Sequence, residues 1–193
     1  MENLSPEFWS ERYKTSNTGW DLGVISPPIK EYIDQIEDKS IRILIPGCGN
    51  AYEAEYLHQL GFTNIHVLDF ASEPLRDLIN RVPDFPVNHL HQDDFFVHKG
   101  QYDLIIEQTL FCAIVPQLRG DYVNSVKDLL APKGKLVGLL FNRNFEGGPP
   151  FGGNMEEYEN LFLTEFTDVN MEDCYNSVAP RMGSELFVQI HKS

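Results

Sequence analysis

The sequence predicts an α/β fold in which a mostly parallel β-sheet carries helices on both faces. From Ser40 onward, short apolar runs alternate with amphipathic stretches, which is typical of chains that build strand–helix–strand units. The apolar runs are nearly continuous, as expected of strands that are buried on both faces. A glycine-rich turn follows the first run, at a point where open parallel sheets commonly bind ligands.

The first half of this region contains three predicted strands and two predicted helices. We expect strands at 41–45, 64–69 and 87–92, and helices at 51–60 and 72–81. The first strand is rich in β-branched residues and ends at Pro46-Gly47. Gly61 ends the first helix, whereas Ser72 can cap the second helix and Pro74 suits its first turn. The second strand ends in an acid, Asp69.

The second half continues the alternation and closes with a pair of strands. We expect strands at 102–107, 135–141, 168–173 and 185–191, and helices at 116–130 and 155–166. In the helix from 116 to 130, Val123, Val126 and Leu130 fall on one face. The tripeptide Pro132-Lys133-Gly134 favours a turn, and a loop rich in glycine and proline spans residues 142–153.

The segment 1–39 precedes the first predicted strand and contains both tryptophans of the chain, Trp9 and Trp20. If residues 5–14 are helical, Trp9 and Tyr13 lie on the same face of the helix because they are four residues apart. We therefore predict one domain, 1–193, in which 1–39 is an N-terminal flap that covers a cofactor site on the core 40–193. These aromatic side chains either clamp the flap to the core or form a wall near a cationic ligand, and the two roles are compatible.

The composition excludes several classes of protein. The 193 residues include 29 acidic and 15 basic ones, a net charge of −14, which disfavours a nucleic-acid partner and an anionic membrane surface. No basic start precedes an apolar run, and no apolar run approaches the roughly 20 residues that span a bilayer. The three cysteines are too scattered for a disulfide framework. We expect a reduced cytoplasmic protein that is a monomer or a weak dimer, with a small molecule as its partner.

The turn after the first strand, Gly47-Cys48-Gly49, permits a close ligand approach in front of a helix N-terminus. A dinucleotide fingerprint would require glycine at position 52, but Tyr52 stands there and acidic residues follow it. A nucleoside ligand without phosphate, such as S-adenosylmethionine, avoids both objections. Asp69, at the end of the second strand, can accept hydrogen bonds from the two ribose hydroxyls of such a ligand, or can merely cap the next helix.

The sequence Asp93-Asp94-Phe95-Phe96 follows the third strand, where a carboxylate could accept from an adenine amine and an aromatic ring could stack on the base. The alternative is a polar turn followed by core aromatics. His89 and His91 lie on one face of the third strand and could form a metal trio with Asp93. Because no fourth ligand is evident, we expect no metal site.

A series of short motifs runs along nearly the whole chain, from about Pro6 to Lys192: Phe8-Trp9, Arg12-Tyr13, Thr18-Gly19-Trp20-Asp21, Ser26-Pro27-Pro28, Pro46-Gly47-Cys48-Gly49, Asp94-Phe95-Phe96, Phe111-Cys112-Ala113, Pro132-Lys133-Gly134 and Gly147-Gly148-Pro149-Pro150-Phe151. In this order and spacing, the motifs resemble those of the thiopurine S-methyltransferase-like family, and within it the branch of halide and thiol methyltransferases. The resemblance implies a Rossmann-like class I methyltransferase fold, a seven-stranded sheet with an antiparallel last strand, and S-adenosylmethionine as cofactor. It implies that the cofactor contacts Trp9, Tyr13, Trp20, Gly47, Asp69, Asp94, Phe95 and Gln108.

The chain departs from the pattern of this family at three places. Tyr13 stands where the family often has tryptophan, and Gln108 stands where tyrosine or arginine is frequent. Asn142-Arg143 replaces a more apolar stretch with proline on the side of the acceptor. The first two departures alter the donor pocket without removing it, whereas the third bears on the identity of the acceptor.

We expect a methyltransferase that acts on a small soft nucleophile: a thiol, hydrosulfide, halide or thiopurine-like compound. The residues that we place near the acceptor are Phe111, Cys112, Phe151 and Arg181. Cys112 is expected to be a packed thiol, and Arg181 either attracts an anionic acceptor or is a solvated charge. No dedicated catalytic acid or base is expected, because a soft anion needs no base when it attacks. Two alternatives remain open, a module that binds S-adenosylmethionine without turnover and a nicotinamide-dependent oxidoreductase.

Overall fold

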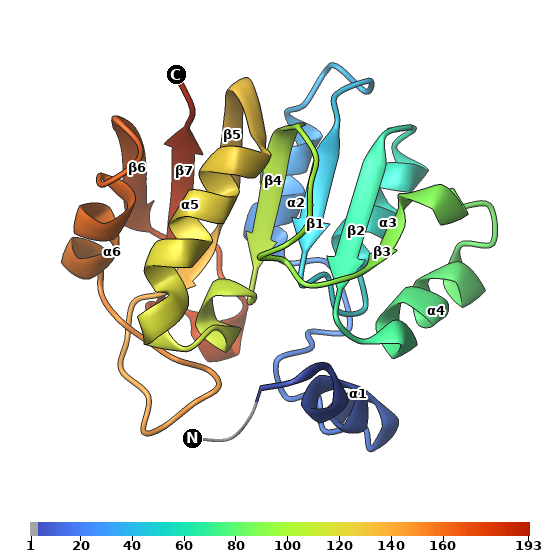
Figure 1. The fold of residues 1–193 in the computed structure, drawn as a ribbon, viewed down its shortest axis with the longest axis horizontal. Helices are drawn as coiled ribbons and strands as arrows, with labels where there is room; N and C mark the ends of the chain where they lie inside the picture. Colours follow the sequence, from blue (N-terminus) through green and yellow to red (C-terminus); the bar gives the residue numbers. More distant parts are fainter. Residues whose placement is uncertain (1–3) are drawn as a thin grey trace.

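A single seven-stranded sheet forms the centre of the molecule in the computed structural model, which describes residues 4–193 (Figure 1). The strand order is β3-β2-β1-β4-β5-β7-β6. The strands are β1 Ile43–Pro46, β2 Ile65–Asp69, β3 Leu90–Gln92, β4 Tyr102–Gln108, β5 Leu130–Phe141, β6 Asp168–Asp173 and β7 Glu185–His191. The α-helices are α1 Pro6–Lys14, α2 Pro27–Asp34, α3 Tyr52–Gln59, α4 Ser72–Arg81, α5 Arg119–Leu129 and α6 Met155–Phe162.

The direction of the strands confirms the predicted class of fold. Strands β1 to β5 pair in parallel, β7 is antiparallel to β5, and β6 is antiparallel to β7. The last strand is therefore the one that runs against the others. The chain order reverses between β1 and β4, and open α/β sheets bind ligands beyond the carboxyl ends of the strands at such a switch point.

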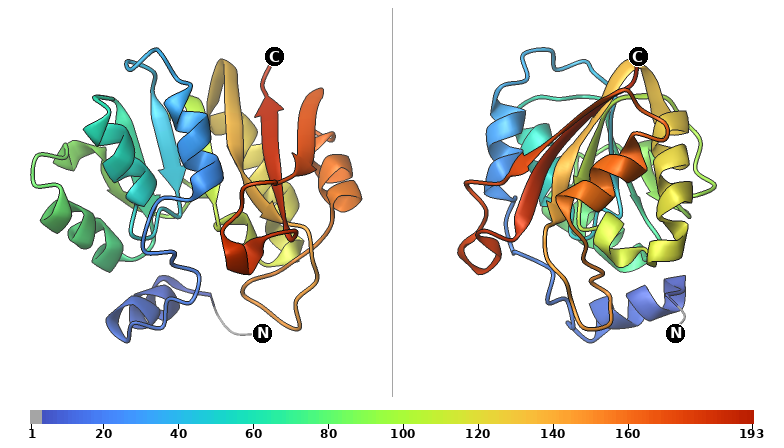
Figure 2. Two further views of the ribbon diagram at one scale, coloured as in Figure 1. Left: turned by 180° about the vertical axis from the view of Figure 1, so that it is seen from behind. Right: turned by 90° about the vertical axis from the view of Figure 1, so that its left-hand side faces the viewer.

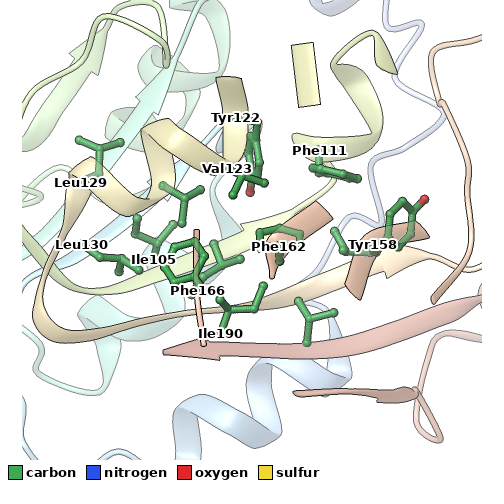
Figure 3. Packing of buried hydrophobic residues seen from close by; sticks show 14 of the residues in the cluster. Ile105, Phe111, Tyr122, Val123, Leu129, Leu130, Tyr158, Phe162, Phe166 and Ile190 are labelled. Atoms are coloured by element: carbon green, nitrogen blue, oxygen red, sulfur yellow. The ribbon is translucent and has the colours of Figure 1, made fainter. Parts of the chain in front are cut away.

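Helices cover both faces of the sheet (Figures 1 and 2). On one face, α5 and α6 pack against the sheet through aromatic and aliphatic side chains that include Tyr122, Tyr158 and Phe162 (Figure 3). On the other face, the core contains side chains from α2, α3 and α4 together with those of the central strands. Each fully buried side chain of this size contributes roughly 1.5–3 kcal/mol to folding, so the two cores fix the sheet on which the loops stand.

The helix α2 was not expected from the sequence. Ser26 precedes two prolines at the start of this helix, a position where the missing N–H of proline is harmless. Ile29 and Ile33, one turn apart, are completely buried against the sheet. The segment 1–39 thus has two parts: α2 packs into the core, whereas α1 and the loop around Trp20 lie beyond one end of the sheet (Figure 1).

Several predicted boundaries are wrong. The predicted strand 87–92 begins with a 3-10 turn, Val87–His89, and only Leu90–Gln92 pairs with β2. The predicted turn at Pro132-Lys133-Gly134 is a bulge inside β5, where Lys133 has a φ of 65° and the register against β4 shifts. The helix predicted to Phe166 ends at Phe162, and the hydroxyl of Thr164 donates to the Leu161 carbonyl just beyond that end.

Four histidines gather around β2 and β3, an arrangement of which the sequence revealed only His89 and His91. The ring of His66 stacks on that of His89, with centroids 4.1 Å apart, and its Nδ1 lies 3.0 Å from Nε2 of His91. The Nε2 atom of His98 lies 2.8 Å from the hydroxyl of Tyr102. Within residues 4–193, no group of three histidine, cysteine or acidic side chains is arranged to hold a metal ion.

Burial disfavours the protonated form of His66, His91 and His98. Burial lowers the pKa of His66 to about 3, with further contributions from His89, Arg42, His91 and His98. The pKa values of His91 and His98 are also lowered, chiefly by burial, although the charge of Asp93 opposes the shift in both. A histidine that stays neutral in the folded protein but protonates when unfolded stabilises the fold only while the pH is above its ordinary pKa near 6.5.

We therefore predict that His66 makes the fold sensitive to acid. The melting temperature of the wild type should fall as the pH drops from 7 to 5, and that fall should be smaller in His66→Gln. The two proteins must be compared with each other, because Asp69 and Glu107 also titrate in this range in both of them. Their pKa values are raised in the folded protein, so their contribution to stability increases as the pH falls. Melting curves at several pH values test this prediction, and parallel pH profiles for the two proteins would contradict it.

Candidate active site

A cavity of about 730 Å³ lies beyond the carboxyl ends of the central strands. Its walls come from α1 and the loop to Trp20, the turn after β1, residues 93–96 and the loop 142–153. In Figure 1 the helix α1 and the loop 142–153 flank this end of the sheet. Seven of the eight predicted cofactor contacts line the cavity: Trp9, Tyr13, Trp20, Gly47, Asp69, Asp94 and Phe95.

The turn after β1 is built on left-handed backbone. Gly47 and Gly49 have φ values of 57° and 51°, a region in which residues with a side chain are strained. A Cβ atom at Gly47 would lie 2.8 Å from Cδ1 of Leu110, and one at Gly49 would lie 3.1 Å from the hydroxyl of Tyr13. The turn is therefore packed closely on both sides, and Gly47 itself faces the cavity.

Asp69 is fixed by its backbone neighbours. Its Oδ2 accepts from the N–H of Gly49 at 2.9 Å, and its Oδ1 accepts from the N–H of Ala71 at 2.9 Å. Burial raises the pKa of Asp69 to about 6, and these backbone N–H groups oppose the shift. Each carboxylate oxygen retains a free lone pair, so the side chain can still accept hydrogen bonds from a ligand in the cavity. This geometry fits a pair of ribose hydroxyls.

Three aromatic rings of the N-terminal segment form one cluster on the wall of the cavity, and we call Trp9, Tyr13 and Trp20 the aromatic cluster. The ring of Trp20 meets that of Trp9 edge to face at 5.5 Å and that of Tyr13 at 5.8 Å between centroids. The carboxylate of Asp21, next to Trp20, accepts from the side-chain amide of Asn50, which follows the glycine turn. The cluster is thus tied to the turn after β1.

Asp94 and Phe95 lie at the third side of the cavity. The Oδ1 of Asp94 accepts from the N–H of Phe96 at 2.9 Å, which closes the turn after β3. Phe95 is largely buried, and its ring packs against Phe96 and Tyr122, with centroids 5.6 and 5.2 Å away. Both interpretations of this motif therefore hold in part. The residues form a polar turn followed by core aromatics, and they also line the cavity.

Gln108 is the predicted cofactor contact that does not line the main cavity. It lines a smaller cleft of about 50 Å³ beside it, together with Trp20, Gly47 and Gly49. The Oε1 atom of Gln108 is buried and has no hydrogen-bond partner in the structure. A buried acceptor without a partner is costly, and a donor group of a ligand at the glycine turn would satisfy it. Together with Asp69 and the turn, this atom fits an adenosyl amino acid.

The acceptor residues expected from the sequence separate into two pairs. Cys112 and Arg181 line the cavity, whereas Phe111 and Phe151 do not. Phe111 belongs to the core beneath, where its ring packs against Tyr122 and Tyr158 (Figure 3).

The hydrophobic wall of the cavity comes instead from residues that were not predicted to lie near the acceptor. They are Leu110, Ile114, Val115, Phe141, Phe145, Pro149 and Pro150. The glycine- and proline-rich composition of 142–153 was the available indication for the last three, because long loops at strand ends commonly line sites.

Two charged residues behind the wall were also missed. Glu107 is fully buried; it accepts from the N–H of Phe111 and the hydroxyl of Tyr122, and burial raises its pKa to about 7. Arg119 is 3% exposed and donates to the carbonyls of Phe151 and Gly152 at 3.2 and 3.0 Å. Nothing in the sequence distinguished these residues from surface charges. The structure shows that they hold the walls and do not line the cavity.

Cys112 is a neutral thiol. Burial raises its pKa to about 12, Glu107 adds to the shift, and its Sγ donates to the carbonyl of Thr109 at 3.1 Å. A thiol in this state is a poor nucleophile, since the thiolate is the reactive form. We predict that Cys112→Ala keeps the turnover rate within about threefold of the wild type, because in the methyl transfer expected from the sequence resemblance the methyl group need not pass through this sulfur. Steady-state kinetics test this, and a loss beyond about a hundredfold in a folded variant would contradict it.

No helix formed by residues 4–193 combines the length and the apolar composition that crossing a membrane requires.

The comparisons with known sequences all identify methyltransferases as similar proteins. The profile of the family described as thiopurine S-methyltransferase matches residues 4–188. The chain is 28% identical over 202 residues to "Probable thiol methyltransferase 2" of Arabidopsis thaliana, covering 100% of this chain and 88% of that one. It is 27% identical over 190 residues to "Thiocyanate methyltransferase 1" of Brassica oleracea, covering 95% and 84%. With "Thiopurine S-methyltransferase" of Acinetobacter baylyi it shares 26% over 187 residues, covering 84% and 86%.

The comparisons with solved structures agree on the fold. A 1,6-didemethyltoxoflavin-N1-methyltransferase of Burkholderia thailandensis, solved with S-adenosylhomocysteine, superimposes with a TM-score of 0.72 and 15% identity, covering 97% of this chain and 87% of that one. The magnesium protoporphyrin IX methyltransferase of Synechocystis, also solved with bound SAH, gives a TM-score of 0.71 at 9% identity, covering 97% and 99%. At these identities the likeness concerns the class I methyltransferase fold.

Proposed function

The chain belongs to the thiopurine S-methyltransferase family, and on that basis we propose that it transfers the methyl group of S-adenosylmethionine to a small soft nucleophile, a thiol or hydrosulfide ahead of a halide. The enzyme class, a methyltransferase that uses S-adenosylmethionine, is confirmed by the family and its relatives. The observation that carries the choice of acceptor is the hydrophobic wall of the cavity, in which Cys112 takes part as a protonated thiol.

The donor residues have positioning roles in this proposal. Asp69 accepts from the ribose hydroxyls, Gly47 and Gly49 let the ligand approach the backbone, and Asp94 and Phe95 meet the adenine. Gln108 accepts from the amino acid end of the donor, and the aromatic cluster presents π faces near its cationic sulfur. The donor supplies an activated methyl group, so the protein mainly has to align the nucleophile behind the methyl carbon and exclude water.

The acceptor half favours a nucleophile that needs no base. Within residues 4–193, no histidine lines the cavity, and the carboxylates that line it, Asp69, Asp93 and Asp94, belong to the side that we assign to the donor. The carboxylate of Glu107 lies behind the wall with both oxygens bonded to protein. A hard oxygen or nitrogen nucleophile would need a group to take its proton. A hydrosulfide, thiolate or halide ion is already reactive, and an apolar wall removes the water that would otherwise stabilise it.

Three further properties belong to the same proposal. The protein is one domain whose N-terminal flap covers the donor; it acts in the cytoplasm as a monomer or weak dimer; and it does not modify nucleic acids. The charge of −14 supports the last point, because a polynucleotide acceptor would be repelled.

A panel of acceptors tests the proposal. Release of S-adenosylhomocysteine should be followed with aromatic thiols, hydrosulfide, halides, chalcogen oxyanions, a catechol and an amine. Turnover with the sulfur nucleophiles and then the halides is the expected order. Turnover with the catechol or amine alone would overturn the choice of acceptor, and binding of the donor without turnover on any acceptor would favour the alternative of a binding module.

A further inference from the structure

Arg181 lies in a 3-10 turn, Ala179–Arg181, that precedes β7, and its charge is neutralised where it stands. Its side chain is 10% exposed, and its Nη1 donates to Oε1 of Glu185 at 3.2 Å. Glu185 is buried as well, at 4% exposure. From the sequence we expected this arginine either to attract an anionic acceptor or to be a solvated surface charge. Its burial rules out the solvated charge, and its pairing with Glu185 leaves less of its positive charge for an anionic acceptor in the cavity.

The other nitrogen of the same guanidinium reaches the N-terminal segment. Nη2 of Arg181 donates to the backbone carbonyl of Trp20 at 2.7 Å. The guanidinium also lies over the ring of Phe141, 5.4 Å from its centroid, on the acceptor side of the cavity. One side chain thus connects the turn before the last strand, the acceptor wall and the aromatic cluster. The planar fork of arginine can serve a carboxylate and a carbonyl at once, which the single ammonium of lysine does less well.

The hydrogen bond from Arg181 to Trp20 differs from other polar contacts of α1 and the loop that follows it, which reach the donor side or the surface. Asp21 binds Asn50 next to the glycine turn, and the ion pair of Lys14 with Glu73 has a lysine side chain that is 59% exposed. Exposed pairs contribute little to stability, whereas hydrogen bonds between buried charged groups and carbonyls contribute more. The contact with Arg181 is therefore a part-buried polar link that joins the aromatic cluster to the acceptor side.

We propose that Arg181 is a positioning residue that holds the aromatic cluster closed over the donor, acting through the carbonyl of Trp20. The inference rests on the proposed function, because it takes the cluster to be a wall of the donor site. It has an unexpected consequence: a residue on the acceptor side of the cavity controls the affinity for the donor. Glu185 keeps the guanidinium in place by engaging its other nitrogen.

The aromatic cluster contains both tryptophans of the chain, so intrinsic fluorescence reports on it directly. Titration of Arg181→Met with S-adenosylhomocysteine should show an affinity that is lower by on the order of tenfold, a loss in the range for one charge-assisted hydrogen bond. The tryptophan emission of this variant should shift to the red, because the cluster loosens toward water. Arg181→Lys should recover part of both properties. Arg76→Met removes a positive charge from an exposed position on α4 that does not line the cavity, and it should retain the wild-type affinity for this ligand.

The outcomes separate the inference from the function on which it rests. If wild-type protein binds S-adenosylhomocysteine and a folded Arg181→Met variant keeps its affinity and its emission, the inference is wrong and the proposed function stands. If the wild type does not bind this ligand, both are wrong. If Arg181→Met fails to fold, Arg181→Lys decides by the same two readouts, and wild-type values for both would overturn the inference.

Discussion

Asp69→Ala is expected to weaken the binding of S-adenosylmethionine by about 1–3 kcal/mol, which corresponds to roughly 5- to 150-fold in dissociation constant. The carboxylate lies at the carboxyl end of β2 with both oxygens oriented by the N–H groups of Gly49 and Ala71. Its removal leaves the ribose hydroxyls without their acceptor and frees two backbone donors. The glycine turn loses one of its supports, so affinity should fall more than the stability of the fold.

The pH dependence of binding provides a second test of Asp69. Because the pKa of Asp69 is raised to about 6, the carboxyl is ionised at pH 7.5 and becomes protonated as the pH falls through 6. The wild type should lose donor affinity over that range, whereas Asp69→Ala should show a flatter profile. Calorimetric titrations at pH 7.5 and 5.5 measure both effects. Asp77→Ala removes the same charge from a half-exposed position on α4 and is the matched control. If Asp69→Ala and the control bind the donor equally well, Asp69 does not contact the donor and serves only as a helix cap.

Gly47→Ala is expected to have the larger effect on the site as a whole. Its φ of 57° is strained for any residue with a side chain, and the new Cβ would lie 2.8 Å from Cδ1 and 2.9 Å from Cβ of Leu110. Since Leu110 also lines the cavity, the clash cannot be relieved without moving a wall of the site. We expect a lower melting temperature and a donor affinity reduced by at least about tenfold, in line with the cost of overpacking.

Gly120→Ala provides the matched control for Gly47→Ala. Gly120 lies in the first turn of α5, and a Cβ added there meets no atom within 4 Å. Alanine also favours a helix over glycine, so this variant should be at least as stable as the wild type and bind the donor equally well. Thermal unfolding with and without S-adenosylhomocysteine compares the two variants. A Gly47→Ala protein that the ligand stabilises as much as the control would show that the turn does not touch the donor.

The class of fold was predictable because it depends on local patterns. The β-branched run at β1 and the apolar run at β4 identify buried strands, and glycine or proline marks most of the boundaries. Where the prediction was wrong, tertiary contacts decided. The bulge in β5 depends on pairing with β4 across the sheet, and α2 is stabilised by the burial of Ile29 and Ile33 against strands that follow it in sequence.

The donor side of the site was easier to predict than the acceptor side for a similar reason. Gly47 and Asp69 follow directly from the positions of two strand ends, which are visible in the sequence. Phe111 was predicted to lie near the acceptor together with Cys112, but it lies in a 3-10 turn and its ring packs into the core. The hydrogen bond from Arg181 to the carbonyl of Trp20 could not be predicted, because the two residues are 161 positions apart in the sequence.

Methyl transfer from S-adenosylmethionine to a soft nucleophile is tested most directly by the identity of the methylated product. Purified protein should be incubated with donor carrying a deuterated methyl group, and iodide, hydrosulfide or an aromatic thiol should be supplied in turn. Gas chromatography with mass detection of the headspace, and of an extract for the aromatic thiol, identifies the products. We expect labelled methanethiol and labelled aryl methyl sulfide, with less iodomethane. Labelled product from none of these three acceptors, in a protein that binds the donor, would contradict the transfer to a soft nucleophile.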